Sequence, residues 1–298
     1  ILQASIPSTA DEKMSWYTGQ LRRKHEALLK DGLVKEDEDT LVRLANDYMT
    51  SIDGLIQSDP SCPHVAESQL LHDVWHGENE AGMKVGDSQH IVLDFFEGKE
   101  EAAKRRLIEV GKTQQQAERT VVKLRNILAA NKQRPDAAVE LTMERIKAVH
   151  ATLMKDLLPN AGEFRKERSK PAQSILEYAL PEKIEGLLSD LLTFVTQRAA
   201  ELDRSVWNRN WILLMTLFFR EFLLIHPFSN GNERLARLLV CSFMPHRHVP
   251  VSFDGRRRGE YLDALEDAAA LKPPFSLATF LLRQIVRSLD NLVWLLSP

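Results

Sequence analysis

The chain has 298 residues, 44% of them hydrophobic and 27% charged, and a formal net charge of −3 at pH 7. A chain of this length and composition buries one large core or two smaller ones, which excludes an intrinsically disordered protein. The small negative charge excludes a dedicated nucleic-acid-binding protein, because no basic excess is present to hold a polyanion, and any phosphate site has to be built locally.

Cysteine usage and hydrophobicity favour a cytoplasmic or nuclear protein without a membrane anchor. The two cysteines, Cys62 and Cys241, form neither a disulfide framework nor a metal-binding motif. The most apolar run, WILLMTLFF at residues 211–219, is shorter than the roughly 20 residues needed to span a bilayer, so it predicts a buried core helix. The chain begins with Ile1 and shows no signal-peptide pattern, so we expect a fragment whose native targeting segment is missing.

Helical periodicity runs through nearly the whole chain. Prolines at positions 135, 159, 181 and 227 lie between periodic segments or in their first turns, where proline starts or stops helices. The sequence therefore predicts a mainly α protein. The segments in which apolar residues recur every three or four positions are 12–30, 40–56, 88–98, 117–130, 137–158, 181–203, 260–272 and 275–296.

A stretch without a helical pattern separates two of the long predicted helices. Between Pro159 and Pro181 the sequence contains glycine, a basic cluster and a short β-favouring piece, SILEYAL, which begins at Ser174 and ends at Leu180. This composition predicts a loop or a small β-hairpin.

We divide the chain into an N-terminal helical region, residues 1–135, and a second module, residues 136–298, which contains the most unusual motif.

The motif IHPFSNGNERLARLL at residues 225–239 interrupts the helical pattern. Its proline is expected to end one helix, and Asn230, Gly231 and Asn232 to form the turn into the next. The free backbone N–H groups at the start of that helix, with the small Gly231 beside them, are suited to binding phosphate oxygens. Asn230 as N-cap and Glu233 three residues later match a capping box, in which the glutamate binds the N-cap N–H.

Charged and titratable side chains flank this turn. Arg234 and Arg237 are one helical turn apart, so both guanidinium groups are expected to converge on a polyphosphate. His226 precedes the turn, and a histidine with a pKa near neutral can take a proton from an attacking hydroxyl group. Taken singly, a histidine is usually a hydrogen-bonded core residue and a basic pair is usually solvated. Their combination around one turn favours a phosphate-transfer site.

The stretch HPFSNGNERLAR resembles the signature of Fic-domain proteins, whose usual form is H-P-F-x-[D/E]-G-N-[G/K]-R-x-x-R. The upstream sequence GEFR, at residues 162–165, resembles the family's Gly-x-aromatic-Arg segment, which precedes a flap that docks the target protein. The resemblance covers roughly residues 135–285 and implies a Fic-type helical bundle with a small β-hairpin flap. The matching positions of the signature are His226, Pro227, Phe228, Gly231, Asn232, Arg234 and Arg237.

The resemblance implies a protein adenylyltransferase. Similar proteins bind Mg-ATP and transfer AMP to a Ser, Thr or Tyr hydroxyl group of a target protein, releasing pyrophosphate. It implies that His226 is the general base and that Gly231, Asn232 and the backbone of Glu233 hold the α- and β-phosphates. Residues 174–180 would form the flap, which pairs with the target backbone by strand addition.

The resemblance also implies roles for the two arginines. Arg234 would neutralise charge along the phosphate chain, and Arg237 would reach either the γ-phosphate or an inhibitory glutamate. Many relatives carry an inhibitory helix with the pattern [S/T]-x-x-x-E-[G/N]. The nearest match in this chain is VWHGEN, which has Glu78 and Asn79 in place but Val74 at the Ser/Thr position. We therefore predict that Glu78 pairs with Arg237.

Two positions in the motif depart from the family pattern. Asn230 stands where most relatives have Asp or Glu to hold Mg²⁺, and an amide oxygen can bind the ion but brings no formal charge. Glu233 stands where relatives have Gly or Lys, which puts a carboxylate beside the phosphates. These departures leave two alternatives open: transfer of another phosphate-containing group, as in a kinase, and a helical interaction module without turnover. A homodimer is also left open.

Overall fold

The computed structural model describes residues 42–50 except 44 and 48, 62–76, 83, 85–169, 178–204, 207–245, 261–265 except 262, and 275–296. Within these ranges the chain forms α-helices, short 3-10 turns and loops, and no β-strand, so the predicted mainly α class is confirmed. None of the helices in these ranges combines the length and apolarity required to cross a lipid bilayer. The helix predicted at 12–30, and much of those predicted at 40–56 and 260–272, lie outside the described residues.

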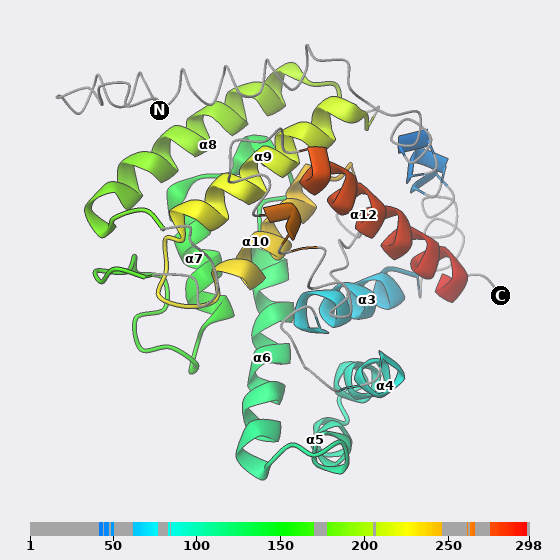
Figure 1. Cartoon of the computed structure of the whole chain (residues 1–298). Coiled ribbons are helices and arrows are strands. Elements are labelled where there is room, and N and C mark those ends of the chain that lie inside the picture. Colours follow the sequence, from blue (N-terminus) through cyan, green and yellow to red (C-terminus); the bar gives the residue numbers. More distant parts are fainter. Residues whose placement is uncertain are drawn as a thin grey trace.

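The helices follow the predicted periodicity, with two additions, α3 and α5, which lie outside the predicted segments (Figure 1). Helix α5 was not predicted, because its sequence EEAAKRRLIE is largely charged and buries only Ala103 and Leu107, which leaves no broad apolar stripe. The helices are α3 (Cys62–His76), α4 (Val85–Phe96), α5 (Glu100–Glu109), α6 (Gln114–Gln133), α7 (Met143–Leu153), α8 (Ile184–Glu201), α9 (Arg209–Ile225), α10 (Asn232–Val240) and α12 (Phe275–Leu296). The 3-10 turns are η1 (Ala138–Glu140), η2 (Pro181–Lys183) and η3 (Cys241–Phe243).

Helix α9 lies at the centre of the core. Its residues 211–222 are all buried, so it presents no solvent face. A helix that is apolar on every side needs neighbours on every side, and α8, α10 and α12 pack against it (Figure 1). The predicted buried helix at residues 211–219 is therefore confirmed. The motif therefore begins at the end of a helix that is packed against three neighbouring helices.

The helices that precede the motif pack onto the same core. Helix α6 begins with a capping box, in which Thr113 Oγ1 accepts a hydrogen bond from Gln116 N at 3.2 Å and Gln116 Oε1 accepts one from Thr113 N at 2.9 Å. Helix α7 packs along α6, and α3 lies against α6, α10 and α12. The predicted division at residue 135 falls between α6 and η1, and buried hydrophobic residues on both sides of it belong to one cluster.

The predicted flap is described only at its C-terminal end. Residues 174–177 lie outside the described residues, and Tyr178, Ala179 and Leu180 form neither helix nor strand. Ala179 N donates to Leu224 O at 3.1 Å, which attaches this end to the last turn of α9. Glu78, the predicted inhibitory residue, also lies outside the described residues, just beyond the end of α3.

Candidate active site

His226 ends helix α9 and turns the chain into the motif. Its backbone has φ 49° and ψ 61°, the left-handed conformation, and its N–H donates to Phe222 O at 3.0 Å. A left-handed residue commonly ends a helix, although glycine fills this position far more often than histidine. The chain therefore leaves the helix axis at His226, and Pro227 prevents the helix from continuing.

The side chain of Asn232 closes the turn. Its Oδ1 accepts from Phe228 N at 2.9 Å, and its Nδ2 donates to Phe228 O at 2.7 Å. Asn232 is 2% exposed, so both hydrogen bonds are shielded from water. The resemblance gives Asn232 a role in holding phosphate. Because its amide is used by the loop, its backbone N–H, in the first turn of α10, is the group left for that role.

Helix α10 begins without a side-chain cap. Its N-cap is Gly231, with φ 79°, and no side chain accepts a hydrogen bond there. Asn230 Oδ1 accepts from Gly231 N at 2.6 Å instead, and Glu233 extends along the helix, with Oε1 3.9 Å from Arg237 Nη2. The predicted capping box of Asn230 and Glu233 is therefore wrong, because the left-handed glycine starts the helix one residue later. The first N–H groups of α10 are not occupied by a glutamate.

A second histidine, His150 of α7, supports the turn from inside the molecule. It is 0% exposed, and its Nδ1 accepts from Gly162 N at 2.8 Å, so Nε2 carries the proton and donates to Asn230 O at 3.0 Å. Its ring stacks on Phe228 with centroids 3.7 Å apart. Burial lowers the pKa of His150 to about 4, and the charge of Arg234 acts in the same direction. His150 was not predicted as a site residue, because its partners are distant from it in the chain.

Arg165 joins the motif to the segment that precedes the flap. Its guanidinium donates to the carbonyl oxygens of His226 at 2.7 Å, of Glu167 at 2.9 Å, and of Ala179. Its backbone N–H donates to Pro227 O at 2.9 Å. Burial lowers the pKa of Arg165, which is 4% exposed and is surrounded by carbonyl groups in place of a carboxylate. Arg165 thus holds separate backbone segments together around His226.

The imidazole of His226 is uncharged at neutral pH. Burial first, and then the charge of Arg165, lower its pKa to about 4, against a smaller raising effect of the carbonyl of Leu223. Its ring stacks on the ring of Tyr178, with centroids 3.8 Å apart and planes 6° apart. Nδ1 is buried and makes no hydrogen bond. A neutral imidazole can accept a proton, so the protonation state fits the predicted general base.

The two arginines of the motif reach different neighbours. Arg234 is 4% exposed, and its Nη1 lies 3.4 Å from the sulfur of Met154, at the end of α7. Arg237 is 1% exposed; its Nη1 donates to Val74 O, in the last turn of α3, at 3.2 Å, and its Nε donates to Glu233 O at 3.3 Å. In this arrangement α3 already contacts the arginine that the resemblance assigns to the γ-phosphate or to an inhibitory glutamate.

The donors at the turn fit Mg²⁺ only as an ion shared with phosphate. In the described ranges no three His, Cys, Asp or Glu side chains gather as a metal site. Asn230 is exposed, and its Oδ1 accepts one hydrogen bond, from Gly231 N, which leaves one lone pair. Magnesium usually binds one or two protein groups together with substrate phosphates. Asn230 can supply such a ligand, with Glu233 as the carboxylate nearest along the chain.

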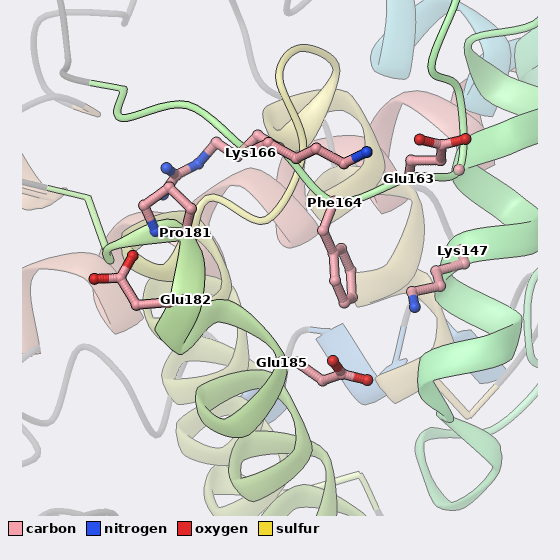
Figure 2. Close-up of a pocket in the computed structure, with 9 residues that line it drawn as sticks. Lys147, Glu163, Phe164, Lys166, Pro181, Glu182 and Glu185 are labelled. Carbon is pink, nitrogen blue, oxygen red and sulfur yellow. The ribbon is translucent and has the colours of Figure 1, made fainter.

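A cavity of about 780 Å³ lies at the base of the predicted flap, between α7, residues 162–166 and the start of α8 (Figure 2). Phe164 projects into it, with Lys147 Nζ 4.2 Å from the centre of the ring. The same ring packs against Phe228, at 5.5 Å between centroids, and so separates the cavity from the motif. Because none of the predicted phosphate-binding residues lines this cavity, it is not the predicted nucleotide site.

Comparisons with known proteins agree with this geometry. Residues 140–244 match the family model of the Fic/DOC family. The fold is similar to a Fic family protein from Desulfovibrio desulfuricans G20, with a TM-score of 0.66 and 18% identity over 88% of this chain and 75% of that one. It is also similar to Fic-1 from C. elegans, with a TM-score of 0.59 and 18% identity over 96% of this chain and 83% of that one.

A curated relative covers a smaller part of the chain. Over 127 residues, 40% of this chain, the sequence is 28% identical to the ribonucleoside-diphosphate reductase small chain of Ostreid herpesvirus 1. The chain spans only about a fifth of that protein, 21% of its length.

The family match runs across the elements that build the site. It includes α7 with His150, the segment with Arg165, the end of α9 with His226, and all of α10. The similar solved structures extend the likeness of the fold to the helices outside the match. The match to the Fic/DOC family model therefore covers residues 140–244, and the likeness to the solved Fic structures is one of fold.

Proposed function

We propose that this domain transfers AMP from Mg-ATP to a hydroxyl group of a target protein. The observation that supports it best is the pairing of the neutral His226 with the uncapped N-terminus of α10, a few residues later. The first N–H groups of a helix and its dipole favour a bound phosphate group. A proton acceptor and a phosphate cradle on one short turn are what a transfer to a hydroxyl group requires.

The proposed reaction balances on these groups. The acceptor oxygen forms a bond to the α-phosphorus of ATP, the bond from that phosphorus to the bridging oxygen breaks, and pyrophosphate leaves with the bonding electrons. The hydroxyl proton passes to Nε2 of His226. The other ring nitrogen, Nδ1, is buried and makes no hydrogen bond. Little covalent chemistry is left to the protein, so positioning and charge stabilisation dominate.

The other residues of the turn bind and orient. Gly231, Asn232 and Glu233 offer their backbone N–H groups to the α- and β-phosphates, and Arg234 and Arg237 supply positive charge. Asn230, together with phosphate oxygens, would hold Mg²⁺, which would supply positive charge beside the pyrophosphate. Residues 174–180 receive the target backbone, with their C-terminal end attached to α9 through Ala179 N and Leu224 O, 3.1 Å apart.

An interaction module without turnover is the second candidate. Two observations favour it: Asn230 brings no charge to the metal site, and Arg237 already donates to Val74 O in α3 at 3.2 Å. A nucleotide whose γ-phosphate needs Arg237 has to displace that contact first.

Labelled ATP distinguishes these functions. The purified chain is incubated with Mg²⁺ and ATP labelled on either the α- or the γ-phosphate, alone and with a whole-cell protein extract. His226→Ala serves as the inactive variant, and His90→Ala, which removes an exposed histidine on α4, serves as the matched control. We expect α-label to enter protein with the wild type and His90→Ala, and not with His226→Ala.

The other outcomes contradict the proposal in different ways. Incorporation of γ-label alone indicates a kinase. Absence of both labels, with no binding of Mg-ATP by calorimetry, indicates the interaction module. Equal incorporation of α-label by the wild type and His226→Ala removes His226 from the mechanism.

A further inference from the structure

The ring of His226 lacks the polar partner that usually orients a catalytic imidazole. Such rings are commonly fixed by a hydrogen bond from one nitrogen to a carboxylate or a carbonyl oxygen. In His226, Nδ1 is buried and makes no hydrogen bond. The ring has a polar backbone contact with the carbonyl of Leu223, which raises the pKa of the ring but does not meet the distance and angle of an ordinary hydrogen bond to Nδ1. Another contact has to set the plane of the imidazole.

Aromatic stacking supplies that contact. The rings of Tyr178 and His226 are nearly parallel, with planes 6° apart and centroids 3.8 Å apart. Face-to-face contact at this separation fixes both ring planes and excludes water from the covered face. Tyr178 is partly buried itself, which raises the pKa of its hydroxyl group. The stack therefore covers one face of the His226 imidazole.

The backbones on both sides of the stack are held by one guanidinium. Arg165 donates to the carbonyl of His226 at 2.7 Å and to the carbonyl of Ala179, the residue after Tyr178. Ala179 N also donates to Leu224 O at 3.1 Å. Tyr178 is thus anchored to the end of α9 at the point where the predicted flap ends. Its ring lies against His226, next to these two backbone contacts of Ala179.

We propose that Tyr178 is a positioning residue for His226: its ring holds the imidazole plane so that Nε2 faces the acceptor hydroxyl group. This inference rests on the proposed AMP transfer. The hydroxyl group of Tyr178 has no part in it, so a phenylalanine serves equally well. The charged groups around the stack are Arg165, which acts on His226, and Glu233 of α10, which acts on Tyr178. Substituting Tyr178 leaves both charges in place.

Two variants test the stack directly. Tyr178→Phe keeps the aromatic face, and Tyr178→Leu keeps apolar bulk without it. In the full chain with carbon-13-labelled histidine, the His226 signal is assigned with His226→Gln and followed by NMR as a function of pH. We expect the wild type and Tyr178→Phe to share a ring-current shift and a low pKa. In Tyr178→Leu the shift is lost and the pKa of His226 rises by at least about one unit as water reaches the ring.

Transfer kinetics give an independent readout. At saturating Mg-ATP, Tyr178→Leu lowers kcat about tenfold with an unchanged KM for ATP, whereas Tyr178→Phe changes neither. If Tyr178 only stabilised the fold, Tyr178→Leu would lower the unfolding temperature without a selective loss of kcat. All variants are therefore also compared by thermal unfolding. If Tyr178→Leu does not fold, Tyr178→Met takes its place.

Two results overturn the proposal. One is an unchanged His226 signal and pKa in Tyr178→Leu, which means that another contact holds the ring. The other is faster transfer by Tyr178→Leu, which means that the ring obstructs the acceptor. If the wild type transfers no AMP at all, the proposed function fails, and the NMR comparison alone then decides whether the stack orients His226.

Discussion

Gly231 is the residue at which the turn is most sensitive to a side chain. It has φ 79°, and a Cβ built there lies 2.6 Å from the sulfur of Met154. An L-residue in the left-handed region costs about 1–2 kcal/mol, and the contact with Met154 adds to that cost. We expect Gly231→Ala to lower the free energy of unfolding by about 2 kcal/mol or more and to weaken ATP binding, because Met154 also contacts Arg234.

The matched control for this prediction is Gly186→Ala in α8. A Cβ at Gly186 meets nothing within 4 Å, and its φ is not positive. Alanine is favoured over glycine inside a helix by about 0.5–1 kcal/mol, so the control is stabilising. Urea unfolding of both variants makes the comparison, and equal stability of the two would contradict the strain assigned to Gly231.

Glu233 is the residue whose charge is expected to oppose the nucleotide. Its carboxylate lies in the first turn of α10, 3.9 Å from Arg237 Nη2, and it does not fold back onto the N-cap. Removing a like charge near phosphates is worth on the order of 1 kcal/mol, or about fivefold in affinity. We expect both Glu233→Gly and Glu233→Gln to bind Mg-ATP more tightly by calorimetry. Unchanged affinity in both variants would show that the carboxylate does not oppose the phosphates.

The predicted residues of the site divide according to how local their contacts are. His226, Gly231 and Asn232 were predicted from consecutive positions, and the structure places them on one turn between α9 and α10. His150 contacts Asn230 from 80 positions away, and no periodicity marks such a partner. The capping box failed for a local reason, because the sequence does not reveal that Gly231 adopts a positive φ.

At the scale of elements, the contact between α3 and α10 connects the N-terminal helices to the site. Arg237 of α10 donates to Val74 O in the last turn of α3 at 3.2 Å. Glu78 follows α3 within a few residues, and the predicted Glu78–Arg237 pair would strengthen the same contact. We expect Glu78→Gly to tighten Mg-ATP binding and to raise any self-modification, because Arg237 is then released more easily.

The control for Glu78→Gly is Glu67→Gly. Glu67 belongs to α3 and lies two helical turns before Val74. Its substitution therefore removes the same charge from the N-terminal region at a position away from the contact between Val74 and Arg237. Equal self-modification by the wild type and Glu78→Gly would refute the inhibitory role of Glu78. An equal gain in both variants would instead indicate a general loosening of α3.

Elements were predictable where one face is clearly apolar. Helix α9 was predicted from its apolar run at residues 211–219, and it lies at the centre of the core. Helix α5 was missed because most of its surface is charged. A flap of 174–180 stays a prediction over residues 174–177, since the described residues 178–180 form no strand. A short strand is stabilised by the neighbouring strands and side chains that it packs against, and the local sequence pattern does not show which these are.

For the molecule as a whole, the buried histidines make stability depend on pH. The pKa values of His150 and His226 are lowered to about 4, below the 6.5 of a free histidine. Between these values the unfolded state binds more protons than the native state, so the free energy of unfolding falls as pH falls from 6.5 to 4. Asp190 acts in the opposite direction, because burial raises its pKa to about 6.

Replacing His150 isolates its share of this dependence. His150→Phe keeps a ring against Phe228 but removes the titrating group. We expect it to be less stable at pH 7, since Gly162 N and Asn230 O lose their partner, and to lose less stability on acidification. The slope changes by up to about 1.4 kcal/mol per pH unit. Urea unfolding at pH 7, 6 and 5 tests this, and parallel curves for the two proteins would contradict it.

The side chains that hold the turn are distinct from the side chains that depart from the family pattern. His150 binds the carbonyl oxygen of residue 230, and Asn232 binds the backbone of Phe228, so neither support depends on which side chains stand at positions 230 and 233. If the proposed transfer holds, substitutions at those two positions change reactivity while the helices stay folded. On the proposed function, a lineage carrying this turn would lose or regain activity by single substitutions, without passing through an unstable ancestor.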